Sequence, residues 1–71
     1  MSYEVRKEAG ANWQVVGGFA DEASAKAAAL AACTSRAAEF IVYDAKSFEI
    51  GRAVFHDGAA EWRGPGGSLI E

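Results

Sequence analysis

The sequence predicts an α+β domain in which one helix covers one face of an antiparallel sheet, in the order ββαββ(β). Two stretches of β-like residues precede an alanine-rich stretch with helical spacing, and further β-like stretches follow it. At 71 residues, the chain has room for one small domain. We expect a single domain over 1–71 with a four- to five-stranded sheet, a folded core over 1–63 and a Gly/Pro-rich tail over 64–71.

The first two strands are expected to form a hairpin. Tyr3 and Val5 point to one face of the first strand, and charged residues point to the other. The charged positions are Glu4, Arg6 and Glu8. Turn residues over 9–12 join this strand to a second one, which we expect to end at the glycine pair 17–18.

A helix is expected from Glu22 to Arg36, with Asp21 as its N-cap accepting from the backbone N–H of Ala23 or Ser24. One stripe at helical spacing is expected to face the sheet, and its members are Ala23, Ala27, Leu30, Ala31 and Thr34. Because alanine is small, the helix can approach the sheet closely, and large rings from the strands are expected to fill the remaining space. These rings are Trp13, Phe40, Phe55 and Trp62.

The remaining strands surround a segment that is apolar on both faces. The stretch 39–44 is therefore expected to be a central strand. Asp57-Gly58 is a dipeptide typical of a two-residue type I′ hairpin loop. That loop would place Trp62 opposite Ala53 on the covered face. The polar face would then carry Arg52, Val54, His56, Glu61 and Arg63.

No residue pattern in the sequence indicates catalysis, a metal site or a cofactor. His56 and Asp57 are neighbours in sequence, but adjacent strand residues point to opposite faces, so they are poorly placed to form a dyad. The single cysteine, Cys33, is expected to be a buried small side chain. The formal net charge of −3, the lone cysteine and the absence of a long apolar segment favour an acidic, cytoplasmic protein with no membrane association.

Three arginines are expected on the face of the sheet that the helix leaves open: Arg6, Arg52 and Arg63. Basic side chains beside aromatic rings occur on sheets that bind nucleic acid. The alternative is that these arginines form cross-strand charge pairs with Glu4, Glu8 and Glu61 on a solvated face, and this alternative is favoured.

Two groups of proteins resemble this sequence. The segments "WQVV", "GGFADEASAKAAALAA" and "FIVYD" resemble a bacterial family of uncharacterised small domains, which implies a fold and no activity; antitoxin domains share parts of the pattern. The segments "SYEV" and "VFHDGAAEW", together with the alanine-rich helix, resemble small phage-encoded anti-CRISPR proteins. That resemblance implies a non-enzymatic inhibitor that occupies a nucleic-acid-binding surface of a CRISPR effector in the host cytoplasm.

The leading hypothesis is a protein-binding inhibitor of this anti-CRISPR type. Its carboxylates would contact basic residues of the effector subunit, and the candidate residues are Glu4, Glu8, Asp44, Glu49 and Glu61. The alternative is an antitoxin-like or housekeeping module that binds nucleic acid through the three arginines. A homodimer is also expected, in which either the open sheet face or a strand edge is buried and Leu69 and Ile70 of the tail dock.

Overall fold

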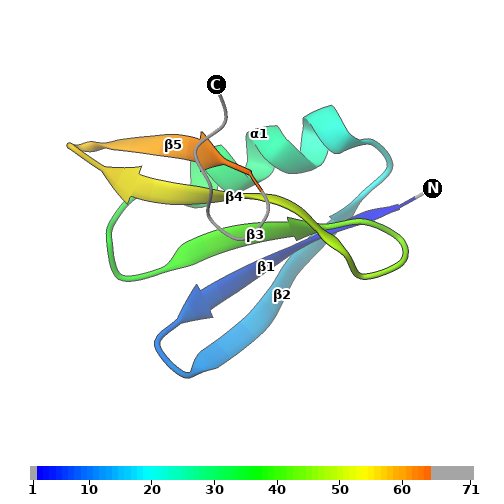
Figure 1. Cartoon of the computed structure of the whole chain (residues 1–71), viewed down its shortest axis with the longest axis horizontal. Helices are drawn as coiled ribbons and strands as arrows, with labels where there is room; N and C mark the ends of the chain where they lie inside the picture. Colours follow the sequence, from blue (N-terminus) through cyan, green and yellow to red (C-terminus); the bar gives the residue numbers. More distant parts are fainter. Residues whose placement is uncertain (1, 65–71) are drawn as a thin grey trace.

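The computed structural model describes residues 2–64, which form one five-stranded antiparallel sheet with a single helix on one of its faces (Figure 1). The elements are β1 (Tyr3–Ala9), β2 (Asn12–Phe19), α1 (Glu22–Ala32), β3 (Glu39–Tyr43), β4 (Glu49–His56) and β5 (Ala59–Arg63). The strand order in the sheet is β2-β1-β3-β4-β5, and α1 contacts all five strands. The predicted fold class is confirmed.

The first hairpin has a two-residue loop in which Gly10 adopts a positive φ of 63°, as the first position of a type II′ turn requires. The prediction that β2 ends at the glycine pair 17–18 was wrong, because both glycines pair with β1 and the strand continues to Phe19. The irregularity lies at Val16, an extra residue between the partner of Arg6 and the partner of Val5. This is a β-bulge, and it changes the alternation of side chains along β2.

The helix begins as predicted but ends earlier. The Asp21 carboxylate accepts from the backbone N–H of Ser24 at 2.7 Å, and this bond lowers the pKa of Asp21. The predicted end at Arg36 is wrong, because Cys33 leaves the helix with an extended backbone at φ −81° and ψ 92°. This turn buries the Cys33 side chain under β4, with its Sγ 3.6 Å from the Ala53 carbonyl oxygen. The hydroxyl of Ser35 then accepts from the N–H of Ala37, a local bond that competes with helix continuation.

The predicted helix stripe was also wrong. The positions that face the sheet are Ala25 and Ala29, both fully buried, followed by Cys33. The expected contact residues Ala23, Ala27, Ala31 and Thr34 are exposed, and only Leu30 is half-buried. A shift of two positions rotates the contact face by about 200° on a helix with 3.6 residues per turn. Alanine occupies both faces, so the sequence offers no contrast from which to choose between them.

The C-terminal strands follow the predicted register. Asp57 and Gly58 have φ angles of 52° and 80°, as a type I′ turn requires, and Ala53 pairs with Trp62. The Trp62 ring fills the space above Gly51, where a Cβ atom would overlap the ring. Phe40, Phe55 and Trp62 pack in the core cluster beneath α1.

Trp13 does not belong to that core, contrary to the prediction, since it is 59% exposed. It pairs with Glu8, and the alternation along β1 puts Glu8 on the face away from the helix.

Candidate functional site: the open face of the sheet

The open face is the side of the sheet away from α1, and its side chains form ordered rows across the strands. The register aligns one row across all five strands, consisting of Val15, Arg6, Ile41, Arg52 and Arg63. Neighbouring positions on the same face carry the carboxylates of Glu4, Glu8, Glu39, Glu49 and Glu61. Five carboxylates therefore surround three guanidinium groups, and the face is negative overall.

Arg52 lies at the centre of the strongest ion-pair group on this face. Its Nε and one terminal nitrogen donate to the two carboxylate oxygens of Glu49, at 3.0 and 2.7 Å. The other terminal nitrogen donates to Glu39 at 2.8 Å. The hydrogen bond to Glu49 is the main reason that the pKa of Arg52 is raised above its usual value. All three guanidinium nitrogens are thus occupied by carboxylates of the same chain.

Arg6 is held between two aromatic rings. Its guanidinium carbon is 4.9 Å from the centre of the Trp13 ring and 4.4 Å from that of the Tyr43 ring, and its Nε pairs with Glu4. The stack spans β2, β1 and β3, because Trp13 and Tyr43 lie diagonally across from Arg6. Tryptophan, tyrosine and arginine are the residue types that dominate binding energy at protein interfaces.

The part of the open face formed by β4 and β5 carries a smaller charged group around Glu61. One oxygen of Glu61 accepts from Arg63 at 3.3 Å, and the other lies 3.1 Å from Nδ1 of His56. Asp57 is more distant from the same nitrogen, at 3.6 Å. Among residues 2–64, no hydroxyl or thiol hydrogen-bonds to the His56 ring, so this group has the geometry of a surface charge cluster.

Ile41 is fully buried although the helix lies on the opposite side of the sheet. Its direct cross-strand neighbours are Arg6 on β1 and Arg52 on β4. Arginine buries its aliphatic stem along apolar surface while its charged end stays in contact with water or a partner. These two stems flank Ile41 along the row, and both guanidinium groups are ion-paired.

The structure places four of the five predicted acidic residues on the open face. These are Glu4, Glu8, Glu49 and Glu61. Asp44 instead lies in the turn between β3 and β4, where its Oδ1 accepts from the N–H groups of Lys46 and Phe48 at 2.8 and 3.0 Å. Its carboxylate therefore stabilises a turn. The three predicted arginines all lie on the open face, and each is ion-paired. Leu69 and Ile70 lie outside the described residues.

Sequence reasoning missed three contributors to this face, namely Trp13, Glu39 and Tyr43. The position of Trp13 follows from the first hairpin. With Gly10 and Ala11 as a two-residue loop, Trp13 must oppose Glu8, which already belongs to the charged face of β1. Extending the alternation to β3 places Glu39 and Tyr43 on the same face.

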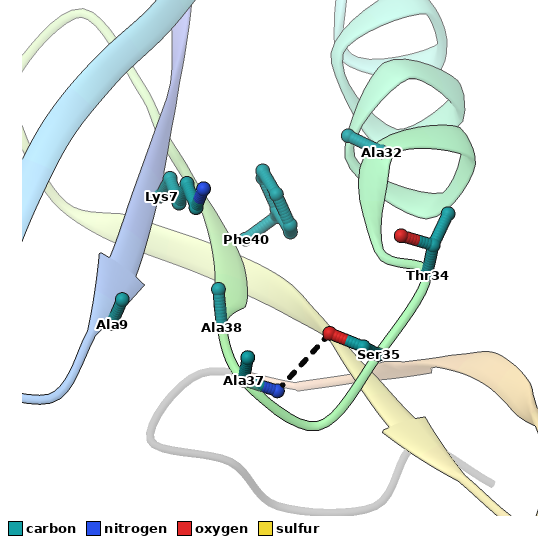
Figure 2. A pocket seen from close by; sticks show the side chains of 8 residues that line it. All are labelled: Lys7, Ala9, Ala32, Thr34, Ser35, Ala37, Ala38 and Phe40. Carbon is teal, nitrogen blue, oxygen red and sulfur yellow. Dashed lines mark hydrogen bonds between the residues drawn. The ribbon is translucent and has the colours of Figure 1, made fainter.

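The hollows elsewhere on the described surface are small. One lies between the end of α1 and the β1–β3 side of the sheet, and Figure 2 shows Lys7 and Phe40 beside the alanines that line it. Its volume is about 150 Å³, whereas small-molecule sites span about 300–1,000 Å³. Within residues 2–64, no group of three or more His, Cys, Asp or Glu side chains is placed to bind a metal ion. The same residues include no helix that is both long and apolar enough to cross a membrane.

Cys33 is the one free cysteine of the chain, and it is buried. Burial, with a smaller contribution from the charge of Glu39, raises the pKa of its thiol. The reactive form of cysteine is the thiolate, so a raised pKa makes Cys33 less reactive at neutral pH.

In comparisons with models of known protein families, with curated proteins and with solved structures, no significant match was found.

Proposed function

We propose that this chain is a non-catalytic protein-binding module whose open sheet face engages a basic surface of its partner. The observation that carries the proposal is the charge arrangement of that face. Its arginines are already paired with carboxylates of the same chain, and the carboxylates outnumber them. Opposite charge on the partner would complement such a face and guide its orientation.

The Arg6 stack supplies the second element of such an interface. Trp13 presents most of its surface to solvent beside Tyr43 and Arg6, which the sheet holds in fixed positions. Rigid aromatic side chains lose little conformational entropy when they are buried by a partner. The proposed interface therefore has an aromatic anchor formed by side chains of β2, β1 and β3, with carboxylates around it.

The class of partner that we propose follows the resemblance to anti-CRISPR proteins. It is a subunit of a CRISPR effector whose basic nucleic-acid-binding surface the open face would cover. A carboxylate-rich face can compete with phosphates for the same lysine and arginine side chains. Inhibition of this kind is steric and electrostatic and needs no catalytic residue.

The alternative, nucleic-acid binding through Arg6, Arg52 and Arg63, requires those arginines to exchange their carboxylate partners for phosphates. Arg52 would have to leave three hydrogen bonds to Glu39 and Glu49. The carboxylates left behind would then face the phosphate backbone. We therefore treat this alternative as an outcome of the test.

The test compares binding to a purified guide-loaded CRISPR effector with binding to mixed-sequence single-stranded RNA and DNA. We expect the chain to bind the effector and to compete with its target nucleic acid. Glu8→Lys on the open face should weaken this binding by about tenfold or more. Glu22→Lys makes the same charge change at the start of α1, away from the open face, and should leave binding within about twofold.

Two results would contradict the proposal. One is equal weakening by Glu8→Lys and Glu22→Lys, which would mean that only net charge matters. The other is salt-dependent binding to the oligonucleotides without binding to the effector, which would support the alternative.

A further inference from the structure

Up to its bulge at Val16, the outer edge of β2 has no charged residue and no proline to discourage pairing with another chain. Strand β2 ends the sheet, and none of its eight residues is charged. Trp13, Val15 and Val16 are 59%, 53% and 46% exposed. Natural edge strands are commonly short or carry charged residues or proline, which discourage pairing with another chain. The opposite edge, β5, has five residues and carries Glu61 and Arg63.

The register determines which main-chain groups of β2 point outward. Ala9 and Asn12 close the two-residue loop, so this pair exchanges both hydrogen bonds in the β1–β2 ladder. Hydrogen-bonded and non-hydrogen-bonded pairs alternate in an antiparallel ladder. The N–H and C=O groups of Trp13 and Val15 therefore face the outer edge, and those of Gln14 face β1.

We propose that a second copy of this chain pairs with β2 in antiparallel orientation, about a twofold axis at Gln14, and so joins two sheets into one. Trp13 of each copy would lie opposite Val15 of the other copy. Both residues present outward main-chain groups, so each such pair exchanges both hydrogen bonds. Gln14 would meet its own counterpart as a non-hydrogen-bonded pair, where Cα atoms approach to about 4.5 Å.

The side chains are compatible with this self-pairing. Trp13 and Val15 lie on the same face of β2, so each copy contributes an aromatic and a β-branched residue to a cluster around the axis. Pairs of this kind stabilise neighbouring strands. Because β2 has no charged residue, the two paired strands bring no like charges of their own together, and each Arg6 nearby is paired with Glu4. Strand β2 is therefore better suited to pair with β2 of another copy than with the charged edge strand β5.

The bulge at Val16 sets the limit of the interface. Beyond Val15 the alternation of β2 changes, so the regular outer edge covers the segment from Asn12 to Val15. A twofold axis at Gln14 uses this regular segment in both copies. The paired sheets would place the two Arg6 stacks near the axis and join both open faces into one surface. The pairing itself does not depend on the partner proposed above.

Light scattering across a micromolar concentration series tests the assembly. The wild-type chain should form a dimer, and Val15→Lys should weaken dimerisation by about tenfold or more, because two lysines would enter the apolar cluster. Phe48→Lys is the matched control: Phe48 is 67% exposed but lies outside β2. It should leave the dimer unchanged. Circular dichroism melts establish that both variants are folded.

Disulfide trapping tests the position of the axis. Gln14→Cys should form an intermolecular disulfide rapidly under mild oxidation, since Cα atoms of bridged cysteines are usually 4.4–6.8 Å apart. Phe48→Cys should do so at least about tenfold more slowly. Native Cys33 is buried, so we do not expect it to form an intermolecular disulfide in this assay.

Three results would overturn the proposal. The first is a wild-type monomer at every concentration, including a monomer that binds a foreign strand along β2. The others are a dimer that survives Val15→Lys unchanged and equal trapping of the two cysteine variants.

Discussion

Beneath α1, alanines of the helix and the sheet pack beside aromatic rings, whereas the open face of the sheet is covered by long charged side chains. Ala25, Ala29 and Ala53 are fully buried on the helix side, where their small side chains leave no room for a larger one. On the open side, Ile41 is equally buried, and its neighbours across the strands are Arg6 and Arg52. The first face is determined by steric fit, which tolerates little change. The second is determined by ion pairs and stacking between long side chains. The charged ends of these side chains can also contact a partner.

The largest effect should come from adding one methyl group on the covered face. In Gly51→Ala, the new Cβ would overlap the Trp62 ring and lie 2.8 Å from the Arg63 carbonyl oxygen. Strand β5 must then move, and we expect the free energy of unfolding to fall by about 3 kcal/mol or more. A domain of this size would then be largely unfolded, which a denaturant titration followed by circular dichroism would detect.

Gly18→Ala is the control on the open face. A Cβ at Gly18 would have its nearest contact with the Tyr3 carbonyl oxygen at 3.8 Å, an ordinary distance. We expect its stability to stay within about 0.5 kcal/mol of the wild type. Similar losses in the two variants would mean that the faces do not differ in steric tolerance.

The second prediction concerns the buried residue on the open face. Ile41→Ala should lower the free energy of unfolding by about 2–3 kcal/mol, because it leaves a cavity beneath the arginine side chains. Val54→Ala on the same face removes a half-buried side chain and should cost about 1 kcal/mol or less. Equal small losses in urea titrations would show that Ile41 is accessible to solvent and that the arginines do not cover it.

The third prediction distinguishes the two faces of α1. Ala29→Leu inserts a large side chain into a fully buried contact and should destabilise the fold by about 2 kcal/mol. Ala27→Leu places the same side chain on the exposed face and should change stability by less than about 0.5 kcal/mol. Thermal melts of the two variants measure the difference in stability. A larger loss for Ala27→Leu than for Ala29→Leu would instead support the contact face expected from the sequence alone.

The sequence was most informative where chemical contrast was strong. The alternation of Tyr3 and Val5 with charged residues, and the Asp57-Gly58 loop, were sufficient to predict both hairpins and the register of β4 with β5. The alanine-rich helix lacks that contrast, because Ala25 and Ala27 are chemically identical and only the packed structure distinguishes them.

The candidate site was predictable in its charges but not in its geometry. Three acidic residues, Glu4, Glu8 and Glu61, and three arginines were assigned to one surface from their positions along the strands. Glu49 joins them because the register shifts between Val42 and Tyr43, which the sequence did not reveal. The Arg6 stack needed the cross-strand register, which brings Trp13 and Tyr43 to the same guanidinium group. Asp44 could not be separated from the other carboxylates by residue type, because its role depends on the turn that follows β3.

The smallest expected effect concerns the ion pairs of the open face. Arg52→Gln removes the charged bonds to Glu39 and Glu49, and we expect it to lower the free energy of unfolding by about 1 kcal/mol, because the group is partly exposed. The loss should shrink in about 1 M salt, where charges are screened beyond roughly 3 Å. Lys46→Gln makes the same change in net charge in the turn before β4 and should be nearly neutral in both buffers. The measurement is a set of urea titrations at low and high salt. A loss of stability for Arg52→Gln that does not depend on salt would assign the effect to packing of the aliphatic stem beside Ile41. Both faces of the sheet would then be stabilised mainly by packing, and they would differ only in the side chains that pack there.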